Sequence, residues 1–219
     1  MKHDLFISSF SLIRKEGITL NNTFLPANGS FTSVADFAKS IYRQNEMSYP
    51  KFFKMDTLSK LGFLSAELLL KEKTAMETWD KTRVGVIAAN STSSLDTDIA
   101  HQKTISDRNA YFPSPAVFVY TLPNILLGEI CIRHKFQGEN AFFVCKTLDP
   151  FLLVDYVTIL FNEMRVEAVL AGWADVLADK FESLFYLVEK KDEQNLQEVP
   201  FHREHSVETL MHLYHNTHK

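Results

Sequence analysis

Apolar residues recur at helical spacing in five stretches of the chain, and each stretch predicts a helix. The five helices are expected at 33–42, 56–72, 123–135, 150–164 and 206–216. Asp56 and Asp149 are residue types that cap helix N-termini, and Pro123 and Pro150 fit a first helical turn. Gly128, inside the third helix, is expected to permit close approach of a neighbour. The fourth helix is apolar on most sides, so it should be central and buried.

Runs of β-branched, aromatic and small residues predict strands at 4–13, 83–89, 141–145, 166–173 and 183–189. The segment 17–24 contains an Asn-Asn turn signal and is expected to continue the first strand as a hairpin. Pro113 and Pro115 should keep the chain extended as far as Tyr120. Because strands and helices alternate, the sequence predicts an α/β fold with a largely parallel sheet.

The composition is that of an ordinary globular protein: 219 residues, of which 46% are hydrophobic and 23% charged. A net charge of −4 argues against a nucleic-acid partner, which requires a concentrated basic surface. No apolar run approaches the roughly 20 residues that span a bilayer, and no signal peptide is recognisable. Two cysteines do not make a disulfide framework. We therefore expect one domain over 1–219 of a soluble, cytoplasmic protein with no membrane partner.

Several short motifs occur in a fixed order: Met55-Asp56, Val84-Gly85-Val86, Pro123-Asn124, Gly138 and Ala171-Gly172. In this order they resemble the N-terminal half of the β-ketoacyl synthases, members of the thiolase-fold family. The resemblance covers about 5–189 and leaves 190–219 as a charged, histidine-rich extension with a helix. It implies a thiolase-like half-fold, in which helices cover both faces of a mixed, mostly parallel sheet.

The resemblance also locates the family's nucleophile. In that family a catalytic cysteine follows the glycine matched by Gly138 by nine residues, at the start of a buried helix. Counting from Gly138 places Thr147 at that position, and a threonine hydroxyl is a poor nucleophile unless a base activates it. Leu148 and Phe151 are expected to crowd the position and close the pocket. The resemblance therefore implies a degenerate nucleophile position and no catalytic residue.

Cys145 is the alternative nucleophile, because a slip of two residues would restore a cysteine. Strand alternation instead places Cys145 on one face of its strand with Ala141 and Phe143. A buried, structural cysteine and a reactive one both remain open.

Catalytic family members carry a second half that supplies two histidines, and this chain is expected to end after the first half. Five C-terminal histidines do not have that context: His202, His205, His212, His215 and His218. Their spacing would place pairs on one helical face, where a metal could bind, but no cysteine or carboxylate completes a ligand set. We expect a solvated helix face, no metal and no cofactor. His101 and His134 are expected to be surface groups.

The strand at 141–145 is apolar, lacks charge and is expected at the sheet edge, which favours pairing with another chain. The resemblance implies a heterodimer with a full-length β-ketoacyl synthase or a homodimer, and an acyl carrier protein as a further partner. Candidate tunnel or interface residues are Phe112, Phe118, Tyr120, Thr121, Phe143 and Phe151.

Three functions follow as hypotheses. The first is a non-catalytic subunit of the chain length factor type in fatty acid or polyketide biosynthesis, similar to half-length proteins beside aryl polyene and flexirubin-type pigment synthases. The second is an acyl-carrier-protein decarboxylase or acyltransferase that uses Cys145 or Thr147. The third is a homodimeric module that binds an acyl group or its carrier protein.

Overall fold

The computed structural model describes residues 4–215 apart from 28, 72, 110 and 191–200. The described strands are β1 Leu5–Arg14, β2 Gly17–Leu20, β3 Thr23–Pro26, β4 Val84–Asn90, β5 Asn140–Val144, β6 Ala168–Leu177, β7 Lys180–Lys190 and β8 Arg203–Glu204. The α-helices are α1 Val34–Gln44, α2 Thr57–Leu70, α3 Leu95–Ile105, α4 Pro115–Val119, α5 Ile125–His134, α6 Pro150–Asn162 and α7 Val207–His215. Short 3₁₀ turns lie at Pro50–Lys54, Thr74–Glu77 and Lys81–Arg83.

All described strands belong to one mixed sheet with the order β3-β2-β1-β7-β6-β4-β5, and β8 pairs with β1. The α/β fold and the mixed sheet are confirmed, but parallel pairing is the minority. Only β4 pairs in parallel, with β5 and β6, whereas the other neighbours are antiparallel. For three of the antiparallel pairs the reason lies in the connections: two residues join β1 to β2, β2 to β3 and β6 to β7. Connections this short permit only antiparallel hairpins.

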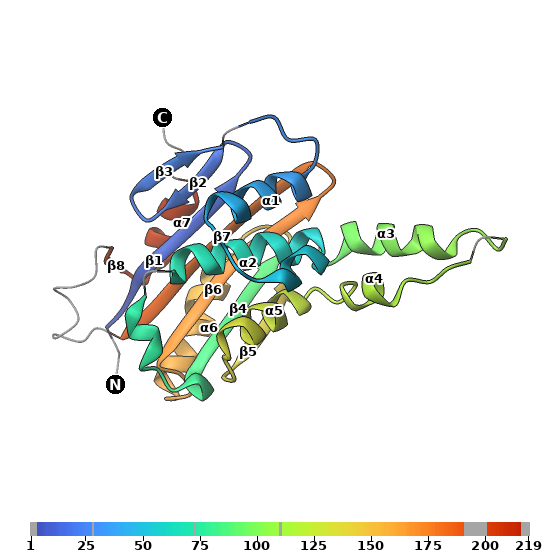
Figure 1. The fold of residues 1–219 in the computed structure, drawn as a ribbon. Helices are drawn as coiled ribbons and strands as arrows, with labels where there is room; N and C mark the ends of the chain where they lie inside the picture. Colours follow the sequence, from blue (N-terminus) through green and yellow to red (C-terminus); the bar gives the residue numbers. More distant parts are fainter. Residues whose placement is uncertain (1–3, 28, 72, 110, 191–200, 216–219) are drawn as a thin grey trace.

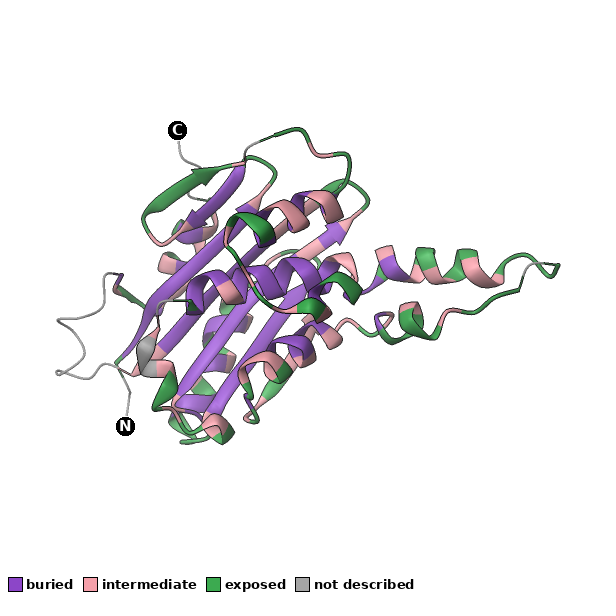
Figure 2. Ribbon diagram, viewed as in Figure 1, coloured by how far each residue is buried: buried purple, intermediate pink, exposed green. Residues whose placement is uncertain are grey.

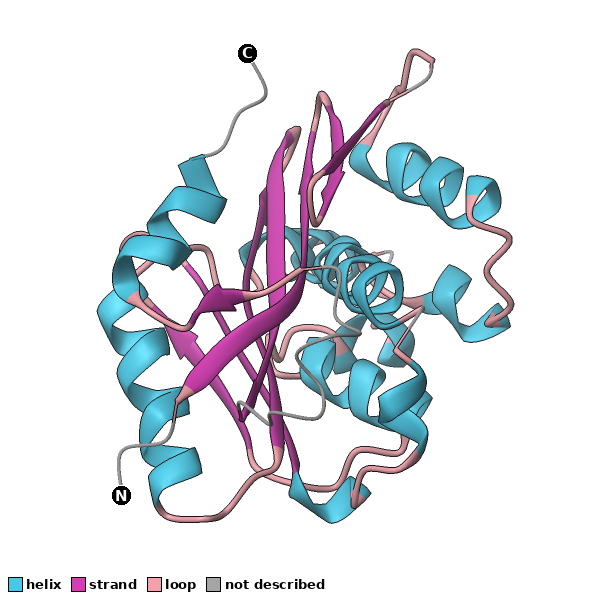
Figure 3. Cartoon of the chain, turned by 90° about the vertical axis from the view of Figure 1, so that its left-hand side faces the viewer, coloured by secondary structure: helices cyan, strands magenta, loops and turns pink. Residues whose placement is uncertain are grey.

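Helices cover both faces of the sheet, as Figure 3 shows in side view. On the first face, α1, α2 and α5 pack against Val86, Ala88 and their neighbours. On the second face, α6 and α7 pack against Ile87, Ala89 and their neighbours. The alternation of side chains along β4 thus feeds two hydrophobic cores.

The predicted helices are all present, but the segment between β4 and α5 differs from expectation. Pro113 and Pro115 do not hold an extended chain, because Ser114 caps α4 by accepting a hydrogen bond from the Val117 N–H at 3.3 Å. Pro115 occupies the first turn of that helix, where its missing N–H costs nothing. Helix α3 was not predicted, since Thr97 is its only fully buried residue and no apolar stripe marks it.

Close helix packing depends on a different glycine from the predicted one. Nothing lies within 4 Å of the position that a Cβ on Gly128 would occupy. A Cβ on Gly62 in α2 would instead lie 2.5 Å from a methyl carbon of Leu126 in α5. Gly62 therefore sets the contact between these two helices.

The C-terminal segment closes the second face of the sheet. Phe201 and Leu210 are buried in the second core with Leu153 and Phe161 of α6. A polar link adds to this packing: Glu182 of β7 accepts a hydrogen bond from the Tyr214 hydroxyl at 2.6 Å. The predicted helix at 206–216 is confirmed as α7, but it belongs to the core and is not a solvated appendage.

His212 and His215 are exposed on α7, as expected, but three other histidines are placed differently from expectation. His202 stacks on the Phe6 ring at 4.3 Å, and His205 is buried beside Tyr186. His134 is not a surface group either, because its Nε2 lies 2.7 Å from the Glu67 carboxylate and both side chains are largely buried. The described residues contain no group of three potential metal ligands. His218 lies outside the described residues.

Burial of His205 predicts a loss of stability in acid. Its imidazole has no hydrogen-bond partner among the described residues, and desolvation lowers its pKa from 6.5 to about 4. The unfolded chain therefore binds a proton more readily, so stability falls as the pH drops from 6.5 toward 4. We expect this histidine to lower the free energy of unfolding by about 2 kcal/mol between pH 7.5 and pH 5, which urea unfolding measures.

The variant His205→Phe should lose that part of the pH dependence, whereas His215→Phe, which changes an exposed histidine of the same segment, should keep it. Equal pH dependence in the wild type and His205→Phe would show that the imidazole is not buried in solution.

Candidate functional site

A long arm extends from the carboxyl end of β4. Helices α3 and α4 run beside each other away from the sheet, joined by an irregular tip (Figure 1). At its base the Ser94 hydroxyl donates to the Thr121 carbonyl at 2.7 Å, which ties the two ends of the arm together. The adjacent turn is held by Asp175 of β6, which accepts hydrogen bonds from the N–H and hydroxyl groups of Ser91 and Thr92. The arm therefore has a fixed root on the sheet.

Most of the arm's apolar side chains face solvent, and Figure 2 shows little buried surface along it. Phe112 near the tip is 77% exposed and Phe118 on α4 is 59% exposed. The Phe118 ring contacts the His101 ring of α3 at 5.4 Å, which orders it within the arm. Further exposed apolar residues are Leu95, Ile99, Tyr111, Val119 and Leu122. These five residues, together with Phe112 and Phe118, are called the arm surface.

Tyr120 does not belong to the arm surface, although it is close in sequence. Its ring is buried at the arm's root, and its hydroxyl donates to the Glu129 carboxylate of α5 at 2.9 Å. Lys51 forms an ion pair with the same carboxylate at 2.9 Å. Burial is the main cause that raises the pKa of Tyr120, and the hydrogen bond to Glu129 raises it further. Tyr120 thus anchors the arm, and Thr121 beside it is half-buried.

Strand β5 is the outermost strand at one end of the sheet, as predicted. The Cys145 N–H bonds to the Asn90 carbonyl at 2.8 Å and the Glu139 carbonyl accepts from Val86 at 2.9 Å, so these groups face β4. In a parallel ladder the alternate residues point the other way, so the backbone groups of Phe142 and Val144 face outward. The Val144 side chain is 58% exposed. A second strand could pair along this edge.

The turn after β5 carries Thr147. This residue is exposed, and no hydrogen bond joins its hydroxyl to another described residue. Helix α6 starts three residues later at Pro150, and Asp149 caps it by accepting a hydrogen bond from the Leu152 N–H at 3.0 Å. Leu148 packs into the second core and Phe151 is 64% exposed, so neither covers the hydroxyl. The expectation that these two residues crowd Thr147 is therefore wrong, because Leu148 turns to the core and Phe151 to solvent.

Cys145 packs against the second core with Ala141 and Phe143, on the face that strand alternation predicted. The Phe143 ring also meets the Tyr156 ring of α6 edge-on at 5.2 Å. Burial, together with the nearby Asp149 carboxylate, raises the pKa of the Cys145 thiol. A raised pKa keeps the thiol protonated at neutral pH, which is the opposite of what a nucleophilic cysteine needs.

The structure separates the six predicted tunnel or interface residues into three places. Phe112 and Phe118 lie on the arm, Tyr120 and Thr121 lie at its root, and Phe143 and Phe151 flank the turn after β5. Sequence reasoning missed the apolar residues of α3, which lie among charged neighbours and give no helical stripe. A signal was present in the run Tyr111–Phe112, two adjacent aromatic residues in a polar segment.

No helix in the described part of the chain is both long and apolar enough to cross a bilayer. No protein-family model matches the sequence, and no curated protein matches it.

Solved structures do resemble the fold. A type II polyketide acyl carrier protein in complex with its ketosynthase matches over 89% of this chain with a TM-score of 0.66 and 14% identity. The ishigamide ketosynthase/chain length factor matches over 85% with a TM-score of 0.62 and 15% identity. A ketosynthase in complex with its chain length factor from Xenorhabdus doucetiae matches over 87% with a TM-score of 0.52 and 11% identity.

This chain spans 64% and 62% of the first two matched chains and 80% of the third. At such low identity the likeness concerns the fold alone. The chain therefore has the thiolase-like half-fold of ketosynthase and chain length factor structures.

Proposed function

We propose that this protein is a non-catalytic, ketosynthase-like subunit of the chain length factor type, which pairs with a full-length β-ketoacyl synthase in fatty acid or polyketide biosynthesis. The observation that carries the proposal is the pair of residues after the β5 edge. Thr147 is exposed and no described residue forms a hydrogen bond with its hydroxyl, and Cys145 is half-buried with a raised pKa. Because neither residue is activated as a nucleophile, we infer that this ketosynthase-like fold acts by binding another subunit.

The exposed apolar groups support association with another subunit. The outward edge of β5 and Phe151 lie at one end of the sheet, and the arm surface extends from the adjacent β4. Monomeric proteins rarely expose large contiguous apolar patches, so residues of this kind favour a protein interface. A full-length ketosynthase is the proposed occupant, since complexes of a ketosynthase with a chain length factor are among the matched structures. An acyl carrier protein would then dock on the pair.

The test uses the chain purified alone and co-expressed with a β-ketoacyl synthase encoded beside it. We expect a stable 1:1 complex by size-exclusion chromatography with light scattering. Intact-mass spectrometry after incubation with an acylated carrier protein should show an acyl adduct on the synthase and none on this chain. The matched control is the chain with Cys145→Ser, which should behave like the wild type because the thiol has no role.

Two results would contradict the proposal and favour the alternatives. An acyl adduct on Cys145 or Thr147 would identify a decarboxylase or acyltransferase. A stable homodimer that ignores the synthase but binds acylated carrier protein would identify a separate binding module.

A further inference from the structure

Gly128 in α5 is a glycine that neither its backbone angle nor its packing explains. All seven glycines of the chain lie among the described residues, and two of them, Gly17 and Gly29, have positive φ angles that side chains rarely adopt. At four others an added Cβ would lie 3.3 Å or less from another atom: Gly62, Gly85, Gly138 and Gly172. Nothing lies within 4 Å of the Cβ position of Gly128. A glycine inside a helix nevertheless lowers helix stability relative to alanine, so its presence here needs a reason outside the monomer.

Gly128 lies on an exposed apolar stripe of α5. Ile125, Gly128 and Ile132 are spaced by three and four residues, which places them on one face of the helix. Ile132 is 61% exposed, whereas Ile125 and Gly128 are half-buried. The stripe is turned away from α2, which Leu126 contacts from the other face. The stripe carries no charge, and Leu122 of the arm surface directly precedes it in the chain.

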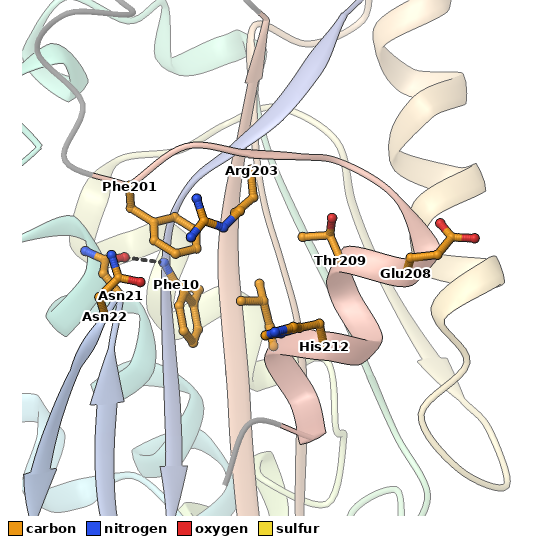
Figure 4. Close-up of a pocket in the computed structure, with 9 residues that line it drawn as sticks. Phe10, Asn21, Asn22, Phe201, Arg203, Glu208, Thr209 and His212 are labelled. Atoms are coloured by element: carbon orange, nitrogen blue, oxygen red, sulfur yellow. Dashed lines mark hydrogen bonds between the residues drawn. The ribbon is translucent and has the colours of Figure 1, made fainter. Parts of the chain in front are cut away.

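The chain itself covers the apolar side chains toward the other end of the sheet. Beside the β1–β2 hairpin, Phe10 and Phe201 contact each other and are at most 2% exposed. The Arg203 guanidinium lies over the Phe201 ring at 5.3 Å, so the hollow seen there in Figure 4 offers no open aromatic surface. In the described part of the chain no segment covers the stripe of α5 in this way, and it is available to another molecule.

The position of α5 relates the stripe to the outer strand of the sheet. α5 contacts both β4 and β5, and it lies beside β5 in Figure 1. A strand of a second subunit that pairs antiparallel with β5 would be related to it by a two-fold axis perpendicular to the sheet. Such an axis keeps each face of the sheet on its own side. The helix that covers the partner's edge strand would therefore lie next to α5.

We propose that α5 packs against this helix of the partner subunit and that the two helices cross at Gly128, between Ile125 and Ile132. The partner is the ketosynthase, so this inference rests on the proposed function. A glycine at the crossing lets the two backbones approach closely, and the two isoleucines pack on either side of it. The β5 edge would supply backbone hydrogen bonds, and α5 would add a side-chain contact that tolerates little change in volume.

The test replaces Gly128 with leucine in the full chain and measures two properties that should change in opposite directions. In the chain alone the Cβ position is open and leucine favours a helix more than glycine does, so the thermal midpoint should rise by a few degrees. In the complex the leucine would occupy the space of the partner helix. The affinity for immobilised synthase should therefore fall by about tenfold or more.

Gly128→Ala gives a graded comparison, because it should also stabilise the chain but weaken the complex less than Gly128→Leu. The matched control is Gln44→Leu, which adds leucine at an exposed position of α1, on the far side of α2 from α5. Its affinity for the synthase should stay within about twofold of the wild type.

The outcomes separate the helix contact from the proposed function. If the wild type binds the synthase and Gly128→Leu binds it equally tightly, the helix contact is wrong and the proposed function stands. A lower thermal midpoint of Gly128→Leu would show that this space is filled within the chain, which also overturns the contact. A wild type that forms no complex with the synthase would overturn both.

Discussion

Replacing Val144 with lysine is expected to weaken the proposed complex with a ketosynthase more than 100-fold while the chain itself stays folded. Val144 is 58% exposed on the outward edge of β5, so the lysine should change the free energy of unfolding of the monomer little. In a paired edge the ammonium would lose water and find no partner, and an unpaired buried charge costs several kcal/mol. Charged residues on edge strands prevent pairing in natural proteins for the same reason. Surface plasmon resonance with immobilised synthase measures the change.

Val144→Thr is the matched control, because threonine keeps the branched shape without a charge. We expect it to weaken the complex by less than tenfold. Full binding by Val144→Lys would show that β5 is not part of the interface, and the arm surface alone would then have to account for association.

Replacing Glu182 with alanine is expected to lower the free energy of unfolding by about 3 kcal/mol. Its carboxylate accepts hydrogen bonds from the Trp173 ring N–H at 3.0 Å and the Tyr214 hydroxyl at 2.6 Å, and pairs with Arg14 at 3.3 Å. Burial and the bond to Glu182 raise the pKa of Tyr214 to about 12, as expected for a well-held hydroxyl. Without the carboxylate, the buried indole N–H loses its acceptor. Helix α7 loses one polar attachment to the sheet and keeps the bond from Arg14 to the Tyr214 carbonyl at 2.8 Å.

Urea unfolding at pH 7.5 measures the loss, and Glu167→Ala serves as the control. Glu167 pairs with Arg83 at 3.0 Å, but both side chains are well exposed, so this variant should cost less than about 1 kcal/mol. Equal effects of the two variants would mean that α7 does not depend on the Glu182 contacts.

Local chemistry made much of the fold predictable from the sequence. Asp56 and Asp149 cap α2 and α6 through the N–H groups of Ser59 and Leu152, as their residue types indicated. Alternation along β5 placed Cys145 correctly. These features depend on neighbours a few residues away, which the sequence displays directly.

Features that depend on distant partners were not predictable in this way. The burial of His205 follows from packing against Tyr186, and that of Tyr120 from its bond to Glu129. The balance of parallel and antiparallel pairs was missed because it depends on which connections are two-residue hairpins and on the long-range pairing of β1 with β7. The exposure of Thr147 was missed because it depends on where the neighbouring side chains go: Leu148 packs on the second core and Phe151 faces solvent.

The position of the first strand has a consequence for how the protein acquires its structure. β1 lies inside the sheet between β2 and β7, and its partners in β7 are 170 to 185 residues away in sequence. On the ribosome this apolar strand must therefore remain without its main neighbour until nearly all of the described chain has been synthesised. Long-range pairings of this kind slow folding and prolong the exposure of apolar side chains and unpaired backbone groups. Newly made molecules should therefore depend on chaperones more than those of a helical protein of equal size.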